Sequence, residues 1–305
     1  MNTVRLLLSV TNEDNDFQLE QVKGARRAAA QCGADLEILS AEDDGILQSQ
    51  QLLQRIQCSA ELRPTAIIFE PAGSTTLPHV ARAAAAVGIG WLVLSRDADY
   101  IQELRSAFRI PAFVVTPDHR EMGRIQGRQI AALLPRGGIV LYVQGPAHSK
   151  AAALRYEGFL EIKPENIQLR ALKGHWTEGS AGKAIHSWLS LSTSRNTEIA
   201  AVCAQDDSMA IGAHKAFEQS VHELRQSWRQ IPFLGCDGMP QTGQAWVRQG
   251  LLTATVFNPP TAPLAIDLLA GFLRGGSMPA PKILTQARSI PELATLIKAS
   301  AASAK

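Results

Sequence analysis

The sequence lacks the features that would place it in a membrane or bind it to nucleic acid. No apolar run reaches about 18 residues, so no membrane-spanning helix is expected. The formal net charge is only +2, and no long run of Lys and Arg occurs. Nucleic-acid binding needs a concentrated basic patch. We therefore expect neither membrane insertion nor a nucleic-acid partner.

Motifs for catalysis and metal binding are also absent. The sequence contains no GxSxG, P-loop or HExxH pattern. Its seven His and four Cys residues are scattered without metal-ligand spacing. The sequence therefore predicts no enzyme, no metal site and no cofactor. Cys203 and Cys236 lie in apolar runs typical of a core, while a disulfide between Cys32 and Cys58 stays open.

The composition is that of a folded protein with room for two domains. The chain has 305 residues, of which 46% are hydrophobic and 19% charged. Residues 4–10 already read as a strand, and the run is too short for a signal peptide. Two locations follow as expectations: periplasmic if a leader was removed, and cytoplasmic if the chain is complete as given.

Short β-rich runs alternate with segments that suit helices along the whole chain. Strands are expected over residues 4–10, 35–39, 66–71, 90–95, 112–115, 138–145, 167–172, 200–204, 231–235 and 252–257. Helices are expected over residues 17–31, 45–57, 77–87, 118–134, 151–162, 182–191, 208–219, 241–248 and 260–274. Because this alternation builds parallel sheets and the strands exceed one small sheet, we predict an α/β fold with two similar Rossmann-like lobes. A ligand is then expected in a cleft between the lobes.

Two apolar runs end in acidic residues, in the segments 203–213 (CAQDDSMAIGA) and 233–240 (FLGCDGMP). Open α/β sheets place ligands at the carboxyl ends of their strands. This pattern favours Asp206 and Asp237 as ligand-binding residues in one crevice. The alternative is that Asp207 caps the following helix while Asp237 only shapes a turn.

Other polar and aromatic residues follow predicted strands in the same way. They are Phe17 with residues 12–16, Glu70, Ser95, Arg96, Trp176 and Asn258. Carboxylates, amides and a guanidinium pair with vicinal hydroxyls, and aromatic faces stack on sugar rings, so the set suits a polyhydroxylated ligand. Alternatives remain for several: Phe17 and Trp176 as core, Glu70 as a loop charge, and Arg96 paired with Asp97 or Asp99.

The order of four longer motifs resembles a known family. The motifs are residues 155–159 (RYEGF), 204–213 (AQDDSMAIGA), 234–240 (LGCDGMP) and 250–255 (GLLTAT). The chain resembles the periplasmic binding proteins of the ribose-binding type over residues 4–293. That family shares its two-lobe fold with the effector domains of LacI-type repressors.

The resemblance implies an architecture and a ligand-binding set. It implies two lobes, residues 1–117 plus 259–284 and residues 118–258 plus 285–305, joined by three hinge crossovers near 116–119, 258–260 and 283–285. By position, the ligand contacts are Asn15, Asp16, Phe17, Glu70, Ser95, Arg96, His119, Trp176, Asp206, Asp237 and Asn258. The implied function is a monomeric solute-binding protein that delivers a sugar-like ligand to the permease of an ABC importer. The alternative is a cytosolic or sensory ligand-binding protein related to LacI-type effector domains without a DNA-binding domain.

Several positions depart from the ribose-type pattern. That pattern has Asp at Ser95, Asn at Glu70 and Asp206, an aromatic residue at Cys236, and Arg at Ala153. The changes remove one positive charge and relocate the acids. The expected ligand is therefore a sugar other than ribose, a polyol, or a molecule with a cationic group that the acids pair with.

Overall fold

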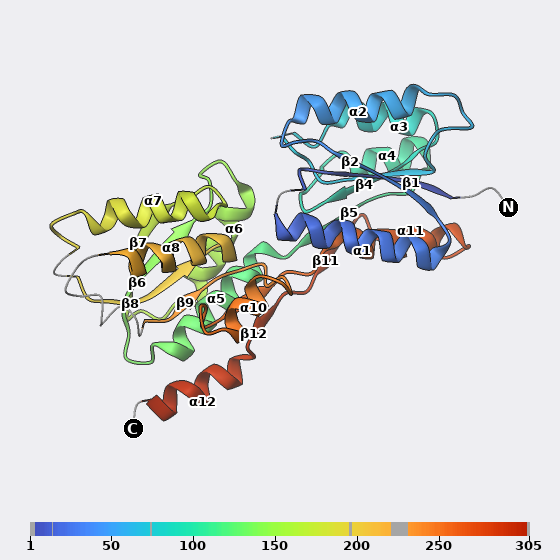
Figure 1. Ribbon diagram of the computed structural model, residues 1–305. Helices are drawn as coiled ribbons and strands as arrows, with labels where there is room; N and C mark the ends of the chain where they lie inside the picture. The colour runs from blue at the N-terminus through green and yellow to red at the C-terminus, as the bar shows by residue number, and fades with distance from the viewer. Residues whose placement is uncertain (1–3, 14, 74, 195–196, 221–230, 304–305) are drawn as a thin grey trace. The chain divides into compact units, whose positions relative to one another are not determined.

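The computed structural model describes residues 4–13, 15–73, 75–194, 197–220 and 231–303. Contacts between residues divide the chain into two compact units. Unit 1 comprises Met1–Pro117 and Pro260–Thr285, and unit 2 comprises Asp118–Pro259 and Gln286–Lys305. The chain thus passes from one unit to the other three times. Each unit is an α/β layer structure of its own (Figure 1).

Unit 1 is built on a six-stranded sheet in the order β11-β5-β4-β3-β1-β2. The strands are β1 (Arg5–Val10), β2 (Asp35–Ser40), β3 (Ala66–Phe69), β4 (Gly90–Leu94), β5 (Ala112–Pro117) and β11 (Lys282–Thr285). Every neighbouring pair is parallel. Their carboxyl ends therefore lie along one edge, where the residues that follow β1, β3 and β4 come together.

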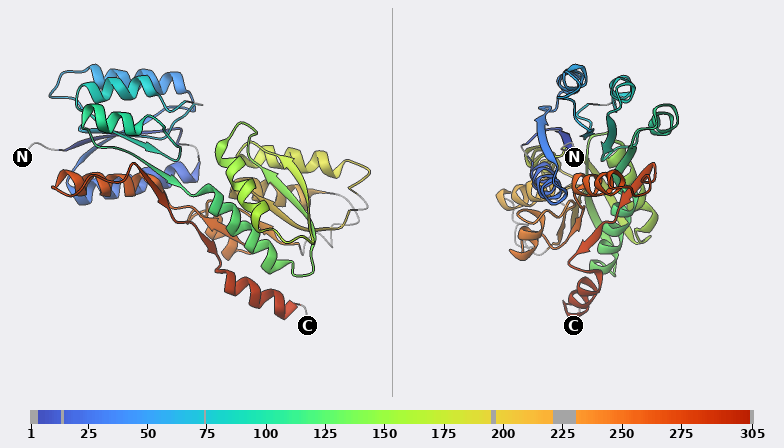
Figure 2. Two further views of the ribbon diagram at one scale, coloured as in Figure 1. Left: turned by 180° about the vertical axis from the view of Figure 1, so that it is seen from behind. Right: turned by 90° about the vertical axis from the view of Figure 1, so that its right-hand side faces the viewer.

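Helices cover both faces of the unit 1 sheet (Figure 2). The helices are α1 (Asp16–Cys32), α2 (Gly45–Gln57), α3 (Pro78–Ala86), α4 (Ile101–Phe108) and α11 (Thr261–Leu273). Helices α1 and α11 pack on one face with Leu6 and Leu8, and α2, α3 and α4 pack on the other with Leu7. This follows from the alternation of side chains along a strand, since both faces of β1 are buried.

Unit 2 contains a four-stranded parallel sheet in the order β7-β6-β8-β9. These strands are β6 (Gly138–Gln144), β7 (Ile167–Lys173), β8 (Ile199–Ala204) and β9 (Phe233–Leu234). A separate antiparallel pair joins β10 (Thr255–Phe257) to β12 (Arg288–Ile290). Single bridges from Leu234 to Ala254 and from Asp237 to Phe257 connect the chain after β9 to β10.

The helices of unit 2 are again divided between the faces of the sheet. They are α5 (His119–Leu133), α6 (Lys150–Ile162), α7 (Glu178–Leu189), α8 (Asp207–Gln219), α10 (Gly243–Arg248) and α12 (Leu293–Ser303). Helices α7 and α8 pack in one core cluster, and α5, α6 and α12 in another. In the described part of the chain, no helix is long and apolar enough to cross a bilayer.

Helices α5 and α6 approach closely because glycine lies at the point where they cross. A Cβ atom on Gly123 would come within 1.9 Å of the Arg155 carbonyl oxygen. In the same way, a Cβ on Gly158 would come within 1.9 Å of the Arg120 carbonyl oxygen. The missing side chains let the two backbones touch, which sets the position of α6 and of Arg155 on it.

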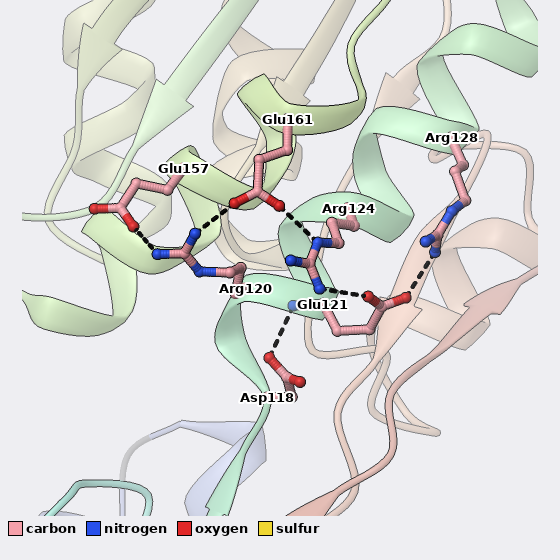
Figure 3. Close-up of polar contacts among 7 residues, drawn as sticks. All are labelled: Asp118, Arg120, Glu121, Arg124, Arg128, Glu157 and Glu161. Carbon is pink, nitrogen blue, oxygen red and sulfur yellow. Dashed lines mark hydrogen bonds and ion pairs between the residues drawn. The ribbon is translucent and has the colours of Figure 1, made fainter.

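A row of charged side chains spans the exposed side of the same helix pair (Figure 3). Arg120 pairs with both Glu157 and Glu161. Further along α5, Arg124 donates to Glu161 at 2.7 Å, and Arg128 donates to Glu121 at 2.7 Å. Asp118 begins α5 by accepting a hydrogen bond from the Glu121 backbone N–H at 2.9 Å. We call these seven residues of Figure 3 the α5–α6 ion-pair row.

The predicted α/β fold with parallel sheets and flanking helices is confirmed, with corrections to single elements. Helix α4 and strands β11 and β12 were not expected from the sequence. The strand predicted over 231–235 is only Phe233–Leu234, and the one over 252–257 is Thr255–Phe257. Cys32 and Cys58 are free thiols, so the disulfide that the sequence left open is not formed.

Candidate functional site

In unit 1, the predicted site residues lie at the carboxyl edge of the sheet around Glu70. Glu70 follows β3, and its backbone N–H donates to the Ser9 carbonyl at 2.9 Å. The Glu70 carboxylate accepts hydrogen bonds from the amides of Gln18 at 3.0 Å and Gln21 at 3.3 Å. Both glutamines project from α1. We call Glu70, Gln18, Gln21 and Ser95 the Glu70 cluster.

The electrostatics of Glu70 reflect partial burial without a paired cation. Burial raises the pKa of Glu70, and the hydrogen bonds from Gln18 and Gln21 oppose that rise. The hydrogen bond from Ser95 and the charge of Arg96 also oppose the rise in the pKa of Glu70, by smaller amounts. Ser95 has a positive φ of 62°, an uncommon conformation outside glycine, and it directs the chain after β4 toward this edge. The structure thus brings Glu70, Ser95 and Arg96 together.

The remaining predicted residues of unit 1 have mixed roles. Asn15 is the N-cap of α1, where its side chain accepts a hydrogen bond from the Gln18 N–H at 2.9 Å. Asp16 lies in the first turn of the helix, and Phe17 is half-buried beside it. The exposed Arg96 donates to the carbonyl of Gly73, whereas Asp97 pairs with Lys282. Arg96 thus has a backbone partner, and its alternative pairing with Asp97 or Asp99 stays a prediction.

In unit 2, a buried arginine that the sequence analysis did not select organises the site. Arg155 lies on α6 and is 5% exposed. Its guanidinium donates to Asp237 at 3.2 Å and to the carbonyl of Gln205. The same guanidinium lies over the Trp176 ring, with 5.5 Å between its carbon and the ring centroid. One cation therefore connects the chain ends after β7, β8 and β9.

The charges of Asp237 and Asp206 act on this guanidinium, and Asp207 follows Asp206 in the chain, so we call Arg155, Asp206, Asp207 and Asp237 the Arg155 cluster. Burial, with a smaller contribution from the charge of Asp237, raises the pKa of Asp206 to about 7. Burial and the same neighbour also raise the pKa of Asp207 well above its usual value. The cluster holds more acid than base, and among the described residues Arg155 forms an ion pair with Asp237.

The carboxyl groups of Asp206 and Asp207 accept hydrogen bonds from different parts of unit 2. Asp206, not Asp207, is the N-cap of α8, where it accepts a hydrogen bond from the Met209 N–H at 2.6 Å. Asp207 accepts from the Gly238 N–H and the Thr255 hydroxyl, each at 2.6 Å. Asp207 therefore holds the loop after β9 against β10. The predicted cap was wrong by one residue, because the chain has Asp at both positions.

Asp237 and Trp176 both occupy strained backbone conformations. Their φ angles are 101° and 60°, in the region that non-glycine residues rarely adopt. The Trp176 ring packs on the backbone of Gly145, where an added Cβ would come within 2.3 Å of it. Such conformations persist only where the surroundings impose them, and they concentrate at functional sites. Trp176 is only half-buried: it packs against the core of unit 2, but part of it stays exposed, unlike a residue that lies wholly in the core.

Two further predicted residues lie in unit 2. Asn258 is 3% exposed, and its backbone N–H donates to the Asp237 carbonyl at 2.9 Å. Its side-chain oxygen has no hydrogen-bond partner within the described ranges of the chain. His119 is the first residue of α5 and is half-buried. Searched over the described residues, the structure contains no group of three side chains suited to hold a metal ion.

Three site residues were not predicted from the sequence: Arg155, Gln18 and Gln21. Arg155 was part of a motif that carried the family resemblance, but its burial was not apparent from the motif. Gln18 and Gln21 are spaced three residues apart on the buried side of α1, among small apolar residues. Polar residues on an otherwise apolar helix face were the signal that could have identified them.

Comparison with known proteins identifies the family. The profile of the family described as periplasmic binding protein domain matches residues 6–277. The chain belongs to this family. Its description is of a binding domain, in line with the prediction that the chain is not an enzyme.

Individual relatives are distant in sequence but match over most of their length. The ribose import binding protein RbsB of Bacillus subtilis is 25% identical over 83% of this chain and 75% of its own. A solute-binding protein of an ABC transporter from Actinobacillus succinogenes, solved with D-allose, has a TM-score of 0.78 at 20% identity over 97% of this chain and 100% of its own. One from Bacillus halodurans, solved with myo-inositol, has a TM-score of 0.77 at 19% identity over 98% of both chains. At these identities the two structures support the fold alone.

Proposed function

We propose that this chain is the solute-binding protein of an ABC importer and binds a sugar or polyol. The observation that carries the proposal is the pair of polar clusters at carboxyl strand ends, one in each unit of a periplasmic binding protein. The Glu70 cluster offers a carboxylate, amides and a hydroxyl. The Arg155 cluster offers carboxylates, a guanidinium and the face of Trp176.

These groups have the chemistry that a polyhydroxylated molecule requires. Carboxylates and side-chain carbonyls accept hydrogen bonds from hydroxyls, and a guanidinium donates to their oxygens. An indole face stacks on the C–H face of a sugar ring. The relatives solved with D-allose and myo-inositol bind molecules of this class. The eleven predicted ligand contacts remain our proposal for the residues that meet the solute.

The proposal includes how binding is coupled to transport. Ligand binding favours whichever conformation of the protein holds the ligand more tightly. The importer's permease would then recognise the liganded form, and the protein would act in the periplasm as its family description indicates. A monomer is the expected form.

A thermal-shift screen against pentoses, hexoses, polyols, amino sugars and nucleosides tests the proposed function. A ligand at about 100 times its Kd stabilises the folded state by ~2.7 kcal/mol, which corresponds to several degrees. One chemical class that gives such a shift supports the proposal. No shift with any member of the panel contradicts the assignment to sugars and polyols.

Two substitutions test the proposed contacts once a ligand is found. Asp237→Ala and Arg96→Ala should each weaken binding by at least about tenfold, since each removes hydrogen bonds made by a charged group. Arg82→Ala is the matched control for Arg96, because Arg82 pairs with Glu103 on the surface of the same unit. Unchanged affinity in both site variants would contradict this placement of the ligand.

A further inference from the structure

The Glu70 side chain is fixed by glutamine residues rather than by a cation. Besides the amides of Gln18 and Gln21 on its carboxylate, its backbone carbonyl accepts a hydrogen bond from the Gln48 amide at 2.9 Å. Gln48 is itself fixed, because it also donates to the Ser9 hydroxyl at 2.9 Å and accepts from the Ala72 N–H at 3.0 Å. The carboxylate is therefore held in one place before any ligand arrives.

The amide of Gln21 is held from the opposite side by α11. Its nitrogen donates to the Thr261 hydroxyl at 2.9 Å, and its oxygen accepts from the Ala262 N–H at 2.8 Å. Both atoms of this buried amide group therefore have hydrogen-bond partners. Gln21 thus acts as a rigid support for Glu70.

The amide of Gln18 leaves an acceptor without a partner. Gln18 is 3% exposed, and its nitrogen must face Glu70 because a carboxylate accepts but does not donate hydrogen bonds. Its oxygen, Oε1, has no hydrogen-bond partner among residues that the structure describes. A buried acceptor of this kind costs free energy until a donor meets it. The Glu70 cluster therefore presents a carboxylate and a neutral acceptor side by side.

No cation of the described chain pairs with Glu70. The ion pairs of unit 1 join other residues, and the nearest positive charge, that of Arg96, is directed to the carbonyl of Gly73. Unit 2 also has more acid than base at its strand ends, since Arg155 pairs with Asp237 while Asp206 lies close enough for its charge to act on the same guanidinium. Partly buried carboxylates are stabilised most by a positively charged donor.

We infer that the ligand carries a protonated amine, which Glu70 and the Oε1 atom of Gln18 bind. An ammonium group offers three donors and a positive charge, so it satisfies both acceptors and offsets the cost of burying the carboxylate. A hydroxyl offers one donor and no charge. The inference rests on the proposed function and narrows its ligand class from sugars and polyols to amino sugars or amino polyols.

Matched pairs of ligands test the inference directly. The Kd is measured by calorimetry at pH 6.5 for glucose and glucosamine, galactose and galactosamine, and mannose and mannosamine, with the N-acetyl forms as neutral analogues. We expect one amine to bind roughly 10- to 100-fold more tightly than its neutral partners, as for a hydrogen bond to a charged group. Equal or tighter binding of the neutral sugar would overturn the inference while leaving the proposed function intact. Absence of binding by every neutral and amino sugar would contradict both.

The variant Glu70→Gln identifies the residue responsible. It keeps the shape and removes the charge, so it should lose the preference for the amine while still binding the neutral partner. Glu103→Gln is the matched control in the same unit, since Glu103 lies on α4 in a surface pair with Arg82. An amine preference retained in Glu70→Gln would overturn the assignment to Glu70. If that variant fails to fold, the ligand pairs measured on the unaltered protein still decide whether an amine is preferred.

Discussion

The two units hold their acidic residues in different ways. In unit 1, neutral glutamine amides hold Glu70, and no cation of the described residues pairs with it. In unit 2, Arg155 pairs with Asp237, while a helix N-terminus and the loop after β9 satisfy Asp206 and Asp207. In unit 2, Arg155 therefore neutralises part of the negative charge of the carboxylates. In unit 1, the negative charge of Glu70 is neutralised only when the ligand binds. Substituting Arg155 should therefore mainly affect stability, whereas substituting Glu70 should mainly affect which ligand is bound.

Removing the central cation of unit 2 should have the largest effect. Arg155→Met leaves Asp237 and its acidic neighbours without a positive charge, and breaking a buried pair in this way costs about 3–5 kcal/mol. We expect a loss of this size in the free energy of unfolding, measured by urea denaturation. Glu70→Gln is the comparison in unit 1 and should change stability by less than about 1 kcal/mol, since its hydrogen-bonding geometry can be retained. Equal losses in both variants would remove the contrast between the units.

The second-largest loss of stability is expected when the close contact between α5 and α6 at Gly123 is disturbed. Gly123→Ala puts a Cβ 1.9 Å from a backbone oxygen of α6, so the helices must separate, and we expect a loss of about 1–3 kcal/mol with weaker ligand binding. Gly179→Ala is the control on α7, where an added Cβ meets nothing within 4 Å. That change should stabilise the protein by less than about 1 kcal/mol, because Gly179 lies in the first turn of α7, where alanine gains less than in a helix interior. A neutral result for Gly123→Ala would show that α5 and α6 need not touch.

The raised pKa of Asp206 predicts a pH dependence of stability. The folded-state pKa is about 7 against a usual 3.8, so between these values the folded protein holds a proton that the unfolded chain has released. The stabilisation that protonated Asp206 contributes is therefore fully present below pH 3.8, and it is lost as the pH rises through 7. Asp206→Asn keeps the helix cap and has no charge to titrate.

The difference in unfolding free energy between the unaltered protein and Asp206→Asn should therefore fall by about 1 kcal/mol per pH unit between pH 5 and 7. Urea denaturation at several pH values measures it. Parallel stability curves for the two proteins would mean that Arg155 keeps Asp206 ionised throughout this range.

The smallest loss of stability is expected for a substitution on the exposed surface of α5 and α6. Arg124→Met removes ion pairs from the α5–α6 ion-pair row, where both partners are about one-third exposed. Exposed pairs contribute about 0–1 kcal/mol and are screened by salt. The loss should disappear at 1 M NaCl, whereas the loss in Arg155→Met should persist. A large, salt-independent loss in Arg124→Met would contradict the distinction between buried and exposed arginines.

The sequence predicted the fold well because the two signals used, the apolar pattern of strands and helices and the residues that end them, are local. The predicted strand over residues 66–71 forms as Ala66–Phe69, and the predicted helix over residues 17–31 forms as α1, which ends at Gly33 with a φ of 71°. The helix α4 was missed although Ile101, Leu104 and Phe108 have helical spacing, because the segment between two strands is short. Local pattern gave little information about β9, whose two-residue length depends on pairing with β8.

The candidate site was less predictable because its geometry is set by distant contacts. The positions of Glu70, Asp206 and Asp237 at strand ends followed from the alternation of elements. Their partners did not, since Gln18 reaches Glu70 across 52 residues and Arg155 reaches Asp237 across 82. Motif matching favoured residues that could touch a ligand, and it gave no weight to buried residues that hold them.

Calorimetric titration of the best ligand tests most directly whether residues of both clusters contribute to ligand binding. The account predicts one ligand per chain, with affinity reduced at least about tenfold both by Glu70→Gln in unit 1 and by Asp237→Asn in unit 2. Two ligands per chain, or unchanged affinity in either variant, would contradict it.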